Sequence, residues 1–147
     1  MLYFLDTSAL VKRYRQEAGT EIIDEIFSDK SSTVVICSLS ICESVKAIDR
    51  HFQKKELSPS DFEKIIELFY SDLHTKLMTI VEIGRPTLFK ANDLIMRHHL
   101  TTVDSIILAS ALAIEDANPV FVCADIRSGL LDAAESCRLS TLNPLSR

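Results

Sequence analysis

The chain opens on an apolar run that ends abruptly in an acidic residue and two hydroxyl residues. Leu2-Tyr3-Phe4-Leu5 is followed by Asp6-Thr7-Ser8, and apolar residues from Leu10 onward then repeat with helical spacing. A short apolar run that stops at turn-forming residues predicts a buried strand that delivers Asp6 to the start of a helix. In an open α/β sheet, ligands bind at the edge where such strands end.

Length and composition indicate one domain spanning residues 1–147, with 47% hydrophobic and 25% charged residues. The net charge of −5 argues against a protein that coats nucleic acid through a broad basic face, but not against an enzyme that cuts it. No basic segment precedes the first apolar run, and no apolar stretch approaches ~20 residues. We therefore expect a soluble cytoplasmic protein without a membrane segment.

Apolar runs and helical patterns alternate along the rest of the chain. Further strands are predicted at 34–37, 77–81 and 120–123, with a short edge strand at 139–142. Helices are predicted through 10–14, 20–27, 41–52, 59–73, 86–99, 103–114 and 126–136. Because strands separated by helices imply right-handed crossovers, we expect a three-layer α/β/α sandwich with a mostly parallel central sheet.

Acidic residues stand at the start of several predicted helices, where each has an ordinary structural explanation. Asp6 and Asp125 both end a strand and precede a helix, so either could be a simple N-cap. Glu43 lies in the first turns of its helix, where the helix dipole favours a carboxylate. Its phase is nearly opposite the apolar stripe of that helix, which by itself predicts a solvated side chain.

Asp104 is harder to explain in this way. It shares a helix face with Ile107, Leu108 and Ala111, so a carboxylate begins a stripe that otherwise faces the core. A buried charge must be paired or bind a metal. The alternative is a capping box in which Thr101 caps the helix and Asp104 stands three residues later.

Taken together, the four carboxylates predict more than each does alone. Two end strands and two begin helices, which in parallel folds all lie at the same edge of the sheet. Carboxylates gathered there would repel one another unless cations intervene. Oxygen ligands without a His or Cys pattern select Mg²⁺ or Mn²⁺, and one or two such ions are typical of phosphoryl chemistry.

The same four positions resemble the motifs of the PIN domain, and within that family the VapC-type ribonuclease toxins of bacterial and archaeal toxin–antitoxin pairs. The resemblance covers essentially the whole chain and is carried by Asp6-Thr7-Ser8, Ser40-Ile41-Cys42-Glu43-Ser44-Val45, Thr102-Val103-Asp104-Ser105-Ile106-Ile107-Leu108-Ala109 and Val122-Cys123-Ala124-Asp125. It departs at one position. Many members carry Thr or Ser two residues before the last aspartate, where this chain has Cys123, which removes a hydroxyl donor beside the site.

The resemblance implies an Mg²⁺- or Mn²⁺-dependent endoribonuclease in which Asp6, Glu43, Asp104 and Asp125 hold the metal and Ser8 supports them by hydrogen bonding. It also implies an RNA substrate, a cognate antitoxin protein and a homodimer. Two other functions stay open: another metal-dependent phosphohydrolase, acting on DNA flaps or small phosphate esters, and a PIN-like module that only binds protein.

Basic residues cluster in two places along the chain. The first group is Lys12, Arg13 and Arg15, and the second is Arg50, Lys54 and Lys55. Either group could line a path for RNA near the site, or simply form solvated helix faces.

Overall fold

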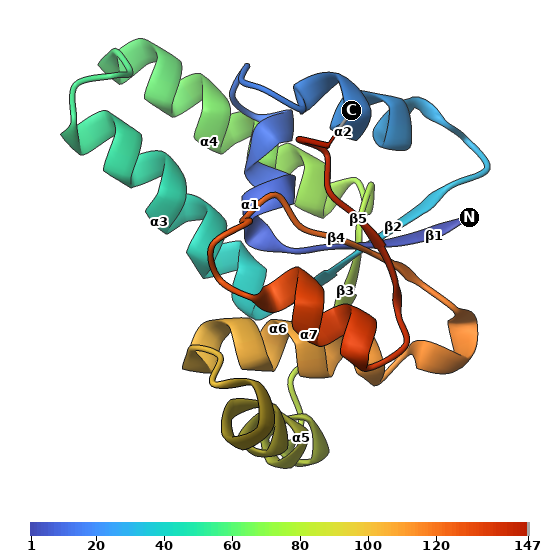
Figure 1. Ribbon diagram of the computed structural model, residues 1–147. Coiled ribbons are helices and arrows are strands. Elements are labelled where there is room, and N and C mark those ends of the chain that lie inside the picture. Colours follow the sequence, from blue (N-terminus) through green and yellow to red (C-terminus); the bar gives the residue numbers. More distant parts are fainter. Residues whose placement is uncertain (147) are drawn as a thin grey trace.

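The computed structural model, in which residues 1–146 are described, is built on a five-stranded sheet (Figure 1). Its strands are β1 (Leu2–Leu5), β2 (Thr33–Cys37), β3 (Thr79–Val81), β4 (Val120–Val122) and β5 (Ser140–Leu142). All neighbours pair in parallel, in the order β3-β2-β1-β4-β5. In the centre, Phe4 of β1 stands opposite Val35 on one side and Phe121 on the other. The predicted parallel sheet is confirmed.

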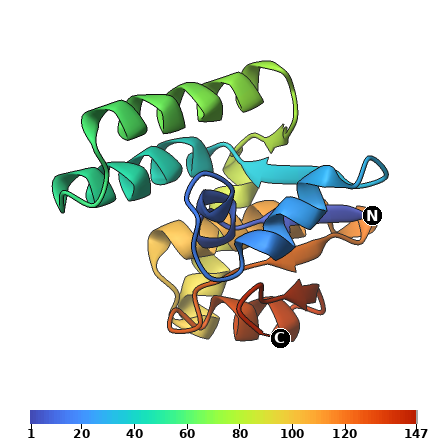
Figure 2. The same ribbon diagram turned by 90° about the horizontal axis from the view of Figure 1, so that it is seen from above.

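Helices connect every pair of successive strands. The α-helices are α1 (Thr7–Leu10), α2 (Thr20–Ser28), α3 (Leu39–Gln53), α4 (Pro59–His74), α5 (Arg85–His98), α6 (Thr102–Leu112) and α7 (Leu130–Ser136). Two 3-10 turns, η1 (Val11–Arg13) and η2 (Glu115–Ala117), complete the chain. The long helices α3 and α4 pack side by side and extend beyond the strands, as Figures 1 and 2 show.

Alternating strand residues divide the core into two halves. Phe4, Val35 and Phe121 pack with buried residues of α5, α6 and α7, whereas Leu5 and Val122 pack on the other face with residues from α1, α2 and α4. This alternation follows from the two-residue period of strands. Because helices cover both faces, the central strands are almost entirely apolar, and the predicted three-layer α/β/α sandwich is confirmed.

The strand order reverses between β1 and β4. The chain adds β2 and β3 on one side of β1, then crosses over and adds β4 and β5 on the other. At such a switch point the loops leaving the two central strands diverge and open a crevice at their carboxyl ends. Asp6 follows β1 and Asp125 lies just beyond β4, so both reach this crevice.

Several predicted boundaries are wrong. The first helix begins at Thr7 and gives way to the 3-10 turn η1 at Val11, instead of running through 10–14. The third strand begins at Thr79 rather than Leu77, and the last helix begins at Leu130 rather than at 126. Gly129, which has a left-handed backbone (φ 73°), precedes that helix. Separately, no helix within residues 1–146 is long and apolar enough to cross a membrane.

Candidate active site

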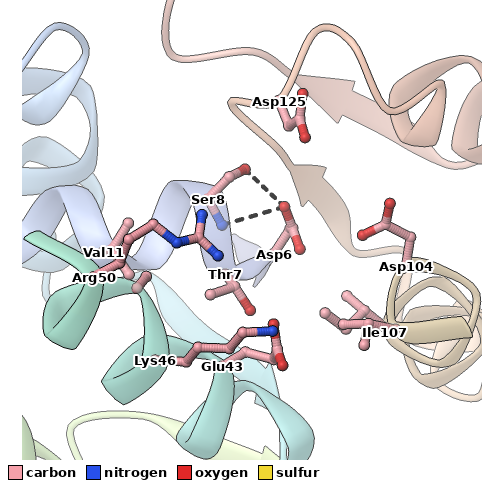
Figure 3. Close-up of a pocket in the computed structure, with 12 residues that line it drawn as sticks. Asp6, Thr7, Ser8, Val11, Glu43, Lys46, Arg50, Asp104, Ile107 and Asp125 are labelled. Atoms are coloured by element: carbon pink, nitrogen blue, oxygen red, sulfur yellow. Dashed lines mark hydrogen bonds between the residues drawn. The ribbon is translucent and has the colours of Figure 1, made fainter. Parts of the chain in front are cut away.

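A cavity of about 230 Å³ lies at the carboxyl edge of the sheet, beyond β1 and β4. All four acidic residues singled out from the sequence line it: Asp6, Glu43, Asp104 and Asp125. They come from four separate parts of the chain and surround a common space (Figure 3). The structure therefore brings together the residues that the sequence predicted to converge.

Asp6 forms the floor of this cavity. Its backbone N–H donates to Val122 O of the neighbouring strand β4 (2.9 Å), which fixes the end of β1. Its side chain, only 4% exposed, caps α1 by accepting hydrogen bonds from Ser8 N (3.3 Å) and Ser8 Oγ (2.7 Å). The N-cap interpretation is thus confirmed, and the same carboxylate still lines the cavity.

Ser8 and Cys123 both bond the same oxygen of the Asp6 carboxylate, Oδ2. The Ser8 hydroxyl donates to Asp6 and accepts from Ala124 N (2.9 Å), so it ties α1 to the segment that follows β4. The Cys123 thiol is fully buried and donates to Asp6 Oδ2 (3.4 Å). A thiol therefore contacts Asp6 from the position at which the family's usual Thr or Ser would supply a hydroxyl.

Burial raises the pKa of Asp6 above its ordinary value, although the hydrogen bonds from Ser8 and Cys123 act in the opposite direction. The fold therefore keeps a carboxyl group in a place where its charged form is costly. A cation beside the group would offset that cost.

Asp104 stands in the first turn of α6, in the cap geometry that the sequence predicted. Thr101 Oγ1 accepts from Asp104 N (3.2 Å), while the Asp104 side chain is partly buried on the cavity wall. Burial, together with the negative charges of Asp6, Asp125 and Glu43, raises the pKa of Asp104 to about 6, although a hydrogen bond with Thr101 acts in the opposite direction. The four acidic side chains are thus near enough to oppose one another's ionisation.

Glu43 and Asp125 differ most from what local pattern alone indicates. Glu43 is turned away from the core, as its helical phase predicted, but it is partly buried because the cavity lies on that side of α3. Asp125 is exposed at the rim and caps no helix, since α7 begins only at Leu130. Its carboxylate instead accepts from Arg127 N (2.9 Å), which closes a short turn.

The basic residues near the site fall into two groups. Lys12 is buried and bonds Glu17 (2.9 Å), Arg13 bonds Asp72 (2.8 Å), and Arg15 contacts both Glu17 and Glu56. These cations form part of the fold and do not line the cavity, so this group neither follows an RNA path there nor forms a simple solvated face.

Arg50 does line the cavity, and so does Lys46, which the sequence interpretation missed. Lys54 and Lys55 are exposed at the end of α3 and are not part of the cavity lining. The available signal was spacing, because Lys46 and Arg50 lie three and seven residues after Glu43 and therefore share its side of the helix.

The cavity suits a hard divalent cation in its chemistry, since its acidic ligands are all carboxylate oxygens. Thr7 adds a buried hydroxyl oxygen for which residues 1–146 provide no hydrogen-bond partner. Within the same residues, no three His, Cys, Asp or Glu side chains stand close enough to hold a single ion in their present positions. The carboxylates surround an open space and would have to move inward onto an ion.

Fold and site together define a parallel α/β domain with a carboxylate-lined cleft at its switch point. In comparison with known families, the PIN domain matches residues 3–125, which is most of the chain and includes all four acidic positions. The chain therefore belongs to the PIN domain family, whose members are generally nucleases. No curated protein matches the sequence.

Solved structures share the fold over nearly the full length. FitAcB from Neisseria gonorrhoeae superposes with a TM-score of 0.68 at 16% identity, covering 100% of both chains. A toxin–antitoxin complex from Klebsiella pneumoniae gives 0.63 at 12% identity, covering 97% of each chain. VapBC2 from Rickettsia felis, bound to a DNA fragment from its promoter, gives 0.62 at 16% identity, covering 97% of this chain and 98% of the other.

Proposed function

We propose that this chain is an Mg²⁺- or Mn²⁺-dependent endoribonuclease and the toxin of a type II toxin–antitoxin pair. The observation that carries the proposal is the convergence of four carboxylates on one cavity, where burial and the charges of the other three raise the pKa of Asp104. Such an arrangement is costly in a protein that only binds a partner, because it brings four like charges close together. It is expected where a divalent cation is to be held.

In this proposal Asp6, Glu43, Asp104 and Asp125 hold the metal or position the attacking water. When bound, one or two ions supply an activated water and stabilise charge on the attacking and leaving oxygens of an in-line displacement. Asp6 would be the ligand whose position is set before the metal binds, because Ser8 and Cys123 restrain its carboxylate. Asp125 sits at the exposed rim and can move toward an ion without disturbing the core.

Metal removal tests the nuclease. We expect RNA cleavage by the purified protein to stop in excess chelator, to return with Mg²⁺ or Mn²⁺, and to return poorly with Ca²⁺, which favours more and longer oxygen contacts. Undiminished cleavage in chelator would refute a metal-dependent mechanism. A panel containing DNA flaps and small phosphate esters separates ribonuclease action from other phosphohydrolase activity.

The toxin assignment is supported by the fold neighbour from Klebsiella pneumoniae, which is described as a toxin–antitoxin complex. We expect a small neighbour-encoded antitoxin to cover the acidic cavity and inhibit, by placing a basic side chain among the carboxylates. We also expect the toxin to be a homodimer acting in the cytoplasm, with light scattering as the test of its mass.

Growth arrest separates the toxin from a nuclease of some other role. Expression of the chain alone in its own host should stop growth, and co-expression of the antitoxin should restore it. If growth continues despite measurable RNA cleavage in extracts, the toxin assignment is wrong and the nuclease assignment stands.

A further inference from the structure

Helix α3 brings more than a carboxylate to the cavity. Glu43, Lys46 and Arg50 occupy positions i, i+3 and i+7, which lie on one side of a helix, and all three line the cavity. In Figure 3 the Lys46 ammonium and the Arg50 guanidinium both point toward the interior of the site. Two cations therefore stand beside the carboxylates on the same wall.

Among the described residues 1–146, neither cation has an acidic partner of its own. Within residues 1–146, neither Lys46 nor Arg50 makes a salt bridge or a side-chain hydrogen bond. Nearby Lys12, Arg13 and Arg15 are all paired with carboxylates. The charges of Lys46 and Arg50 are thus available to a ligand, whereas those of the other three are occupied within the fold.

Two of the carboxylates lie deeper than the cations. Asp6 is buried at the floor and Asp104 is partly buried on the wall, whereas Lys46 and Arg50 are exposed. A phosphate held at the carboxylates would lie deep, and the two cations would meet groups further out. With a helical rise of 1.5 Å per residue, Lys46 and Arg50 are offset by about 6 Å along α3, comparable to the separation of neighbouring phosphates in one strand.

We propose that Lys46 and Arg50 bind the phosphates next to the one that is cleaved, so that a single RNA strand runs along α3 from Glu43 toward Arg50. This inference rests on the proposed nuclease function and adds the path of its substrate. A chain with a net charge of −5 and four carboxylates in its site repels a polyanion. Lys46 and Arg50, which no carboxylate of residues 1–146 pairs with, allow this wall to bind an RNA strand. A substrate with a single phosphate would not use them.

Salt dependence of binding tests the proposal independently of cleavage. We would measure the affinity of fluorescein-labelled oligouridylate RNA by anisotropy at several salt concentrations, with Ca²⁺ present to limit cleavage. Proteins compared are the wild type, Lys46→Gln, Arg50→Gln and the double variant. Lys30→Gln is the matched control, because Lys30 is an exposed lysine just before β2, at the opposite edge of the sheet. Thermal unfolding verifies that each variant is folded.

The double variant should bind more weakly, and its slope of log affinity against log salt should be shallower by about 1.4, since each strand phosphate contact contributes about 0.7. Lys30→Gln should keep the wild-type slope. Cleavage of RNA with Mg²⁺ should fall in kcat/KM in the double variant, whereas Lys30→Gln should keep the wild-type value.

An unchanged slope in the double variant would overturn the inference and leave the two cations as counter-charges to the carboxylates. An equal loss in Lys30→Gln would overturn it as well, because the effect would then reflect overall charge. If the slope falls as expected but the wild type cuts no RNA, the strand path stands and the proposed nuclease function fails.

Discussion

Replacing Asp104 by Asn should stabilise the metal-free protein at neutral pH. In the folded chain the pKa of Asp104 is raised to about 6 from an ordinary 3.8. The carboxyl group of Asp104 therefore loses its proton more readily in the unfolded chain, and its ionisation destabilises the folded state. The stability associated with the neutral carboxyl is present below about pH 4 and is lost as the pH rises to about 6.

The size of the effect follows from the difference between the folded and the ordinary pKa of Asp104. Without screening it corresponds to about 3 kcal/mol, and because the side chain is partly exposed, solvent screening reduces it to about 1 to 1.5 kcal/mol. For a chain of this size that is a rise in Tm of roughly 2 to 6 °C. The measurement is urea unfolding in excess chelator at pH 7 and again at pH 4.

Asp61→Asn is the matched control, since Asp61 also stands three residues after a capping hydroxyl that accepts its backbone N–H. Asp61 is exposed and does not line the cavity, so its replacement should destabilise the protein by about 0.3 to 1 kcal/mol through the helix dipole. If Asp104→Asn is also destabilising at pH 7, or has the same effect at both pH values, the argument from clustered charge is refuted.

Two further substitutions test how the floor of the cavity is built. Asp6→Asn should abolish RNA cleavage. It should also raise Tm in chelator, because Asn still caps the helix while the substitution removes a buried carboxyl whose pKa is raised. Cleavage at the normal rate would mean that Asp6 is only a cap. Ser8→Ala should lower the free energy of unfolding in urea by about 1 to 3 kcal/mol, since it removes a donor to Asp6 and leaves Ala124 N without its acceptor. An unaltered unfolding midpoint would show that these hydrogen bonds do not stabilise the fold.

Most of the fold could be predicted because the sequence marks its central strands so strongly. Residues 2–5 and 34–37 are almost wholly apolar and stand next to helical patterns, which fits only a parallel sheet covered on both faces. The start of the last helix was missed because Asp125 and Ser128 bond the backbone of residues 125–130 locally. Such side-chain bonds compete with helix formation and hold this segment as a turn.

The carboxylates of the candidate site could be found from the sequence, but their surroundings could not. Strand ends and helix starts meet at one edge of a parallel sheet, which is enough to bring Asp6 and Asp104 together. The exposure of Glu43 depends on which elements flank α3, and helical phase carries no such information. The pairing of Lys12 and Arg13, which removes them from the cavity, likewise depends on partners elsewhere in the fold.

Crystals soaked in Mn²⁺ would test the central claim, which is that the four carboxylates bind a divalent cation. Anomalous scattering should place one or two ions in the cavity, with carboxylate oxygens of Asp6 and at least one of Glu43, Asp104 and Asp125 as ligands. Two ions, if present, should lie about 3.5 to 4 Å apart. A cavity that stays empty at saturating Mn²⁺, with Glu43 turned to solvent and Asp6 bonded only to Ser8 and Cys123, would contradict the claim.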